Sequence, residues 1–118
     1  MKKENVLKSK SYTFALRVIG AYKFLSKEQK EFVLSKQLLR SGTAIGALIR
    51  EAEYAQSKAD FINKLNISLK EANETEYWFM LLKDSGFIEK EVFDSIISDC
   101  QELIKLLISS IKTAKTQK

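Results

Sequence analysis

The chain has 118 residues and a formal net charge of +5, with no proline, no histidine, four glycines and one cysteine. This length supports one hydrophobic core, and so little proline and glycine argues against a fold rich in β-turns. No apolar run approaches the roughly 20 residues that cross a bilayer, and the basic residues 1–5 are not followed by the apolar segment of a secretory signal. We therefore expect a cytoplasmic domain of long helices without an internal disulfide.

Positive charge is concentrated in the first part of the chain. Residues 1–50 carry a net charge of +8, whereas residues 51–118 carry −3. Such asymmetry is typical of a protein that binds a polyanion or an acidic partner. Lysine-rich helical surfaces also serve solubility, and the two parts of the chain can complement each other within the fold, so the charge alone leaves both interpretations open.

Apolar residues at three- and four-residue spacing predict a first helix over residues 6–25. The polar residues 26–31 interrupt the pattern and indicate the connection to the next helix. The expected core positions of the first helix are Ala15, Val18, Ile19 and Tyr22.

A second helix is predicted over residues 32–55, where apolar and small residues alternate steps of four and three as the seam of a bundle requires. Two glycines in residues 41–47 cost this helix about 2 kcal/mol relative to alanine. Close approach of another helix can offset that cost, while a locally weak or kinked helix is the alternative. The expected core positions are Leu34, Leu38, Ser41, Ile45, Leu48, Ala52 and Ala55.

A capping box marks the start of the third helix. In Ser57-Lys58-Ala59-Asp60 the Ser57 hydroxyl can accept from a first-turn amide, and an acid follows three residues later. The helix therefore begins near Lys58 and continues to about Ser85, where Gly86 can take the left-handed conformation that ends a helix. Its expected core positions are Phe61, Leu65, Leu69, Ala72 and Phe79.

A fourth helix presents one continuous apolar face, and the polar residues 113–118, like residues 1–5, are expected to fray into solvent. Short connections between long helices make neighbours antiparallel. The prediction is an all-α, antiparallel up-down-up-down four-helix bundle that forms a single domain over residues 1–118. The face of the fourth helix consists of Phe93, Ile96, Ile97, Cys100, Leu103, Ile104, Leu107 and Ile111.

Antiparallel packing brings the start of the first helix, the turn between the second and third, and the end of the fourth to one end of the bundle, here called the basic pole. It gathers eight lysines against four acids, Glu4, Glu51, Glu53 and Asp60. The lysines are Lys2, Lys3, Lys8, Lys10, Lys58, Lys112, Lys115 and Lys118. The candidate nucleic-acid-binding residues among them are Lys8, Lys10, Lys58, Lys112 and Lys115.

Side chains suited to catalysis are scarce. Without histidine, neither the Glu-x-x-His pairs of di-iron bundles nor Ser-His and Cys-His nucleophile pairs can form. Cys100 is in phase with the apolar face of its helix, which favours a buried structural thiol over a reactive one. We expect no enzymatic activity, no metal site and no cofactor.

Three acids cluster on the third helix, but helical geometry separates them. Glu76 points into the apolar face, whereas Glu71 and Glu74 point away from it, so the three cannot form one compact cation site. Glu76 is predicted to be a half-buried acid with a hydrogen-bond partner, a structural role rather than a catalytic one.

Two outward stripes indicate self-association. On the second helix the basic stripe, opposite the core positions, comprises Lys36, Arg40, Thr43, Ala47, Arg50 and Tyr54. On the third helix the tryptophan stripe comprises Ile67, Glu71, Glu74, Trp78 and Leu81. A monomer has little reason to present large apolar residues outward in register, although scattered exposure is common. We predict that Arg40 or Arg50 pairs with Glu71 or Glu74 of a neighbouring subunit, while a pair within one chain is equally compatible.

Residues 41–52 and 70–78, joined by Ser57-Lys58-Ala59-Asp60-Phe61, make the chain resemble the bacterial four-helix-bundle proteins encoded within intervening sequences of 23S ribosomal RNA genes. Accessory proteins of diversity-generating retroelements are distant relatives. The resemblance covers essentially the whole chain and implies a ring-like homopentamer, a role in nucleic-acid binding and no enzymatic activity. The chain departs from the expected pattern at Ala44 and Leu48, where serine and asparagine are commoner, so a function that needs that polar pair is in doubt.

The leading hypothesis is a non-enzymatic homo-oligomer that binds RNA or DNA weakly and without reading sequence, since lysines repeated by symmetry attract phosphates. The alternative is an interaction adaptor whose basic pole docks an acidic protein. Neither hypothesis involves a membrane or a small-molecule substrate. Salt-dependent binding of an unrelated oligonucleotide favours the first, and co-purification with one protein favours the second.

Overall fold

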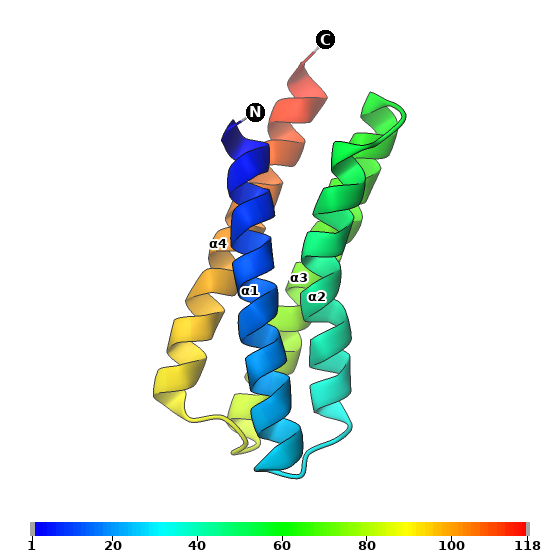
Figure 1. Cartoon of the computed structure of the whole chain (residues 1–118). Helices are drawn as coiled ribbons and strands as arrows, with labels where there is room; N and C mark the ends of the chain where they lie inside the picture. Colours follow the sequence, from blue (N-terminus) through cyan, green and yellow to red (C-terminus); the bar gives the residue numbers. More distant parts are fainter. Residues whose placement is uncertain (1, 118) are drawn as a thin grey trace.

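In the computed structural model, which describes residues 2–117 and the side chains from residue 6 onward, four α-helices form one antiparallel bundle (Figure 1). The helices are α1 (Lys2–Lys27), α2 (Leu34–Glu53), α3 (Lys58–Asp84) and α4 (Lys90–Thr116). Each helix packs against its two neighbours, and the bundle measures 49 × 22 × 19 Å. The predicted all-α four-helix bundle is confirmed. Within the described residues, no helix has the length and apolar character needed to cross a membrane.

The chain ends and the α2–α3 turn lie at one end of the bundle, and the other two connections lie at the opposite end (Figure 1). Helices α1 and α4 extend further than the sequence suggested, whereas α2 is shorter than the predicted residues 32–55. Residues 2–5 and 113–116, which the sequence placed in fraying ends, continue α1 and α4 as helix in this structure. Ile111 and Ala114, which are buried, hold the last turns of α4 on the core. Residues 1 and 118 lie outside the described residues.

The core face of α1 differs from the predicted one by a small rotation about the helix axis. Of the expected residues Val18 is fully buried, whereas Ala15, Ile19 and Tyr22 are half-buried. Apolar side chains surround this helix between residues 14 and 19, so periodicity alone could not fix the buried side. The buried positions of α1 are Leu7, Ser11, Phe14, Val18 and Leu25.

On α2 the predicted stripe holds at its centre but not at its edges. Leu38, Ser41, Ile45 and Ala52 are buried, while Leu34, Leu48 and Ala55 are half-buried. Ile49 takes the core position that Leu48 was expected to occupy. The departure from the family pattern at Leu48 therefore lies at the border of the core rather than within it.

Small residues on α2 allow α1 to come close. A Cβ added at Gly42 would lie 2.7 Å from both methyl groups of Val18, and one added at Gly46 would lie 3.2 Å from Ser11 Oγ. On the other flank, Ser68 Oγ donates to Ile45 O at 2.9 Å and Thr75 Oγ1 donates to Ser41 Oγ at 2.9 Å. The glycines thus serve close helix approach inside the bundle, and α2 continues as an α-helix through them.

The predicted helix-end signals are present at both ends of α3. Ser57 Oγ accepts from Asp60 N at 3.0 Å, which forms the predicted N-cap, and Asp60 Oδ2 accepts at 3.3 Å from the N–H of Gln56 rather than from that of Ser57. Gly86 has φ +85°, the left-handed conformation that follows the end of α3.

The start of α2 is capped by Glu31, the last residue of the polar connection predicted over residues 26–31. Its carboxylate accepts from the backbone N–H groups of Val33, Leu34 and Ser35 at 3.2, 2.9 and 2.7 Å. Burial works to raise the pKa of Glu31, but these N–H groups outweigh burial and hold the pKa below its ordinary value of 4.5.

Replacing Gly42 with alanine should destabilise the protein, while the same change at Gly20 should not. The Cβ at position 42 meets the stiff, buried side chain of Val18, and such overpacking costs about 1–3 kcal/mol against a helix-propensity gain of about 1 kcal/mol. At Gly20 nothing lies within 4 Å of an added Cβ, so the propensity gain remains. Urea unfolding followed by circular dichroism gives both values. A Gly42→Ala protein as stable as Gly20→Ala would contradict the close approach of α1 and α2.

Glu31→Gln should remove a pH-dependent contribution to the free energy of unfolding. Because the folded-state pKa is lowered, the stabilisation is present above pH 4.5 and is lost as the pH falls through the folded pKa. We expect a loss of about 1 kcal/mol at neutral pH, the size of a helix-capping effect, and convergence of the two proteins once the pH lies below the lowered pKa of Glu31. Glu28→Gln, an exposed neighbour, is the control. A constant difference at all pH values would argue against the carboxylate cap.

Candidate nucleic-acid and assembly surfaces

The five predicted nucleic-acid-binding lysines do lie toward one end of the bundle. Lys58 begins α3 at the α2–α3 turn, Lys112 and Lys115 lie in the last turns of α4, and Lys8 and Lys10 lie in the first turns of α1 (Figure 1). Four of them are exposed, and Lys8 is half-buried. The fold therefore gathers the basic pole from three helices.

These lysines differ in how far their charge is neutralised. Lys8 Nζ lies 2.9 Å from Glu53 Oε1, and Lys10 Nζ lies 3.2 Å from Glu102 Oε1. Glu102 lies near the middle of α4, and the sequence does not reveal that this turn of α4 faces Lys10. Exposed pairs of this kind contribute at most about 1 kcal/mol, so a phosphate can displace them.

Lys58, Lys112 and Lys115 are exposed and form no ion pair with any residue whose side chain the structure describes. The helix dipoles change the electrostatic potential at the basic pole very little. Two helices begin at this end and two finish there, so their terminal partial charges offset one another. The sign of the potential at the pole is therefore set by side chains.

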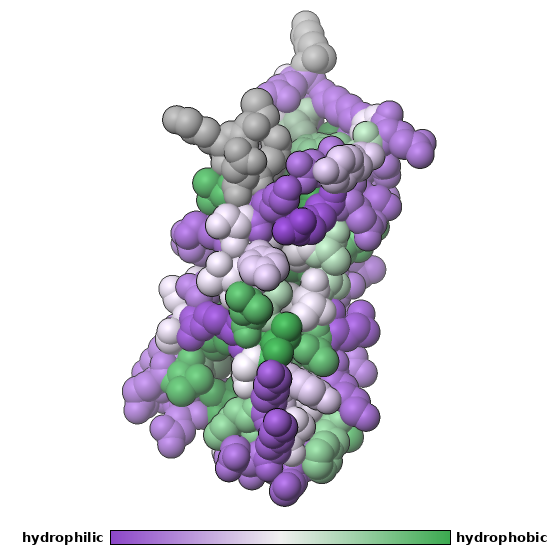
Figure 2. Space-filling model, viewed as in Figure 1, coloured by the Kyte–Doolittle hydropathy of each residue, from purple (hydrophilic) through white to green (hydrophobic). Residues whose placement is uncertain are grey.

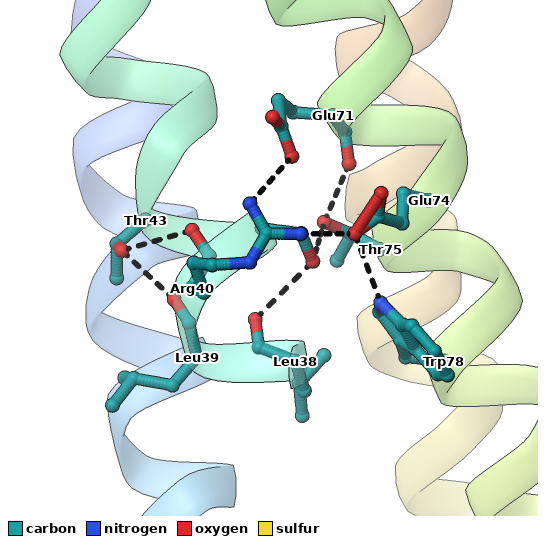
Figure 3. Close-up of polar contacts among 9 residues, drawn as sticks. Leu38, Leu39, Arg40, Thr43, Glu71, Glu74, Thr75 and Trp78 are labelled. Atoms are coloured by element: carbon teal, nitrogen blue, oxygen red, sulfur yellow. Dashed lines mark hydrogen bonds and ion pairs between the residues drawn. The ribbon is translucent and has the colours of Figure 1, made fainter. Parts of the chain in front are cut away.

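The predicted arginine–glutamate contact exists within one chain (Figure 3). Arg40 Nη2 donates to Glu74 Oε1 at 2.5 Å, and Arg40 Nη1 lies 3.8 Å from Glu71 Oε1. Trp78 Nε1 donates to the same Glu74 oxygen at 3.3 Å. For Arg40, the alternative of a pair within one chain is therefore present, between α2 and α3.

One guanidinium thus contacts two carboxylates, so Glu71 and Glu74 together carry one more negative charge than Arg40 neutralises. The Glu71 side chain is 19% exposed, and its Oε1 is buried without a hydrogen bond. A buried carboxylate oxygen at 3.8 Å from its nearest cation gains Coulomb attraction but lacks a donor. A second cation placed here would complete the cluster.

The basic stripe is exposed as predicted along most of its length. Arg50 is exposed and forms no ion pair with a described residue, and Tyr54 at the end of α2 is 81% exposed. Ala47 is exposed as well, whereas Thr43 is half-buried and donates to Leu39 O at 2.8 Å.

The tryptophan stripe is less exposed than predicted. Ile67, Trp78 and Leu81 are all half-buried, and Trp78 packs against the core cluster. Trp78 is on the side of α3 that faces α2, since it donates to the same Glu74 carboxylate that Arg40 of α2 contacts. The more exposed apolar residues of α3 are Tyr77 and Met80, at 55% and 48%, which the sequence analysis did not single out.

Cys100 and Glu76 have the structural roles that were predicted. Cys100 is fully buried, and its thiol donates to Ala72 O at 3.4 Å. Burial, and then the negative charge of Glu76, raise the pKa of this thiol to about 12, so it stays protonated. Half-buried Glu76 accepts from Gln101 Nε2 at 3.0 Å. Among the described residues no group of three or more acids and cysteines is placed to hold a metal ion.

Comparisons with known proteins agree with this architecture. Residues 3–109 match the model of the 23S rRNA-intervening sequence protein family. A crystal structure of a protein of unknown function from the S23 ribosomal protein family of Bacteroides thetaiotaomicron is 65% identical, with a TM-score of 0.92 over 93% of this chain and 98% of that one. A comparison with curated proteins gives no match. The chain thus belongs to the 23S rRNA-intervening sequence protein family.

Proposed function

We propose that this protein is a non-enzymatic homo-oligomer, a ring such as a pentamer, that binds RNA or DNA weakly and without reading sequence. The observation that carries the nucleic-acid part is the convergence of Lys58, Lys112 and Lys115, unpaired among the described residues, on one end of the bundle. Nucleic-acid phosphates are the polyanion that such scattered, flexible point charges suit best.

A single pole of this kind gives low affinity, because few phosphates are neutralised. Ring symmetry would repeat the pole around an axis and make the binding multivalent. Once one subunit is bound, the others meet the same strand at high effective concentration. Assembly and nucleic-acid binding are therefore linked in this proposal.

Assembly rests on the mismatch of charge along α2 and α3. Arg50 has no acidic partner among the described residues, while Glu71 and Glu74 share one arginine. We propose that Arg50 of one subunit supplies the missing cation to Glu71 and Glu74 of the next, with the exposed Tyr54 packing beside it. The two surfaces differ and belong to the same chain, so the contact is heterologous and closes into a ring where the rotation permits.

Changing Lys58, Lys112 and Lys115 to glutamine should weaken binding of a labelled single-stranded RNA and a duplex DNA by about tenfold or more at low salt. The logarithmic salt dependence for duplex DNA should also become shallower by up to about 2.7 per subunit, since each lost phosphate contact contributes roughly 0.9. Fluorescence anisotropy between about 50 and 200 mM salt measures both effects.

The matched control replaces Lys23, Lys27 and Lys30, three exposed lysines toward the opposite end, with glutamine. It changes the net charge equally and should bind nearly as well as the wild type. Equal losses in both triple variants would show that net charge, not the basic pole, drives binding. Failure of the wild type to bind either nucleic acid, together with capture of one acidic host protein, would favour the adaptor alternative.

The combined change of Arg50 to Glu and Tyr54 to Ser should give folded monomers, whereas Lys105→Glu on the outer face of α4 should not change the mass. Trp78, although it belongs to the tryptophan stripe, is not changed, because it packs against the core of its own subunit and its loss would affect folding. Light scattering gives the mass, and circular dichroism checks the fold. An unchanged oligomeric mass in the double variant would exclude this assembly surface.

A further inference from the structure

A groove opens at the end of the bundle opposite the basic pole, between α1, the α3–α4 connection and the start of α4. Its volume is about 670 Å³, within the range of roughly 300–1,000 Å³ that small-ligand sites occupy. The side chains that line it are mostly apolar and include Phe24, Leu25, Phe79, Phe87, Val92 and Ile96.

The groove reaches the core, and its mouth is apolar. Phe79 and Leu25 at its base are fully buried, whereas Phe24 and Val92 at its edge are 44% and 53% exposed. On the face shown in Figure 2, hydrophobic residues gather over the middle of α1 and over the adjoining start of α4. An apolar molecule placed here would remove both edges from water.

Gly20 keeps one wall of the groove open. A glycine inside a helix weakens it, and here the packing of the chain itself does not require one, because nothing lies within 4 Å of an added Cβ. Gly42 is the contrast, since its missing Cβ makes room for Val18 of the same chain. The space beside Gly20 is therefore open to solvent and to a molecule bound in the groove.

Arg17 supplies a polar group at the α1–α4 side of the groove. Its Nη1 donates to Asp99 Oδ2 at 2.6 Å and to Ser95 O at 3.4 Å, and its Nη2 donates to Ser95 Oγ at 3.0 Å. A guanidinium has five N–H donors, so two of them, Nε–H included, have no acceptor among the described residues. Glu89, which also lines the groove, would repel a second anionic group.

We propose that this groove binds a small amphiphile with one aromatic or short aliphatic body and a single anionic oxygen head, a carboxylate or a sulfonate, that accepts from Arg17. The groove lies between α1 and α4, on the side of the bundle opposite the α2–α3 stripes. The inference therefore goes beyond the proposed function and stands independently of it.

Two fluorescent probes test the proposal: 1-anilinonaphthalene-8-sulfonate, which carries the anionic head, and N-phenyl-1-naphthylamine, which is uncharged. The full chain should bind one molecule of either probe per subunit. Gly20→Leu fills the groove and should weaken both probes by about tenfold or more. Thr13→Leu places the same side chain on an exposed position of α1 two turns away and should leave both unchanged. Equal affinities in the two leucine variants would overturn the site.

Arg17→Gln should weaken the sulfonate probe by about tenfold while leaving the uncharged probe unchanged. Asp99→Asn breaks the same ion pair between α1 and α4 but keeps the guanidinium, so it should bind the sulfonate at least as well as the wild type. Equal weakening of both probes by Arg17→Gln would remove the anionic-head assignment. Loss of probe binding as the protein self-associates would show that a second copy covers the groove, and the proposal would then be wrong.

Discussion

The small-residue seam of α2 determines how the rest of the bundle packs. On one flank Gly42 and Gly46 let α1 approach until Val18 and Ser11 lie against the α2 backbone. On the other flank the carbonyl of Ile45 and the hydroxyl of Ser41 accept hydrogen bonds from α3. Steric contact between α1 and α2 and hydrogen bonds between α2 and α3 together fix the register of these three helices. Apolar packing alone would specify that register less sharply. The cost of two glycines in a helix is offset by this closeness.

Once the register is fixed, it determines which charges meet and which do not. Toward the middle of the bundle opposite charges on adjacent helices come together, as Arg17 does with Asp99 and Arg40 with Glu74. At the end where the chain termini lie, Lys58, Lys112 and Lys115 are exposed and have no ion-pair partner among the residues whose side chains the structure describes. Repulsion among these lysines destabilises the folded state slightly, and a bound polyanion would reduce that repulsion.

The sequence predicted best those features that depend on a few neighbouring residues. The Ser57 cap, the Gly86 stop and burial of Cys100 each follow from local pattern, and each is present. The buried side of α1 could not be fixed, because apolar residues occur all round it between residues 14 and 19. Glu31 was missed because its carboxylate caps a helix from outside the usual capping position. Ion-pair partners such as Glu102 depend on the register between α1 and α4, which no local pattern encodes.

The surplus of apolar residues that obscured the phase of α1 also explains why the molecule has a groove. The core admits one face of the helix, so Leu16 and Phe24 remain 54% and 44% exposed. Near the start of α4 the helices α1 and α4 are bridged by the polar contacts of Arg17 rather than by interlocking apolar side chains, and Gly20 adds no side chain to fill the space. Exposed apolar side chains thus lie beside the Arg17 guanidinium, which has two N–H groups without an acceptor among the described residues. Small-molecule sites in other folds have the same composition, an apolar wall and one polar group that orients the ligand. Helix α1 therefore packs closely against α2 on one side and borders the groove on the side of α4.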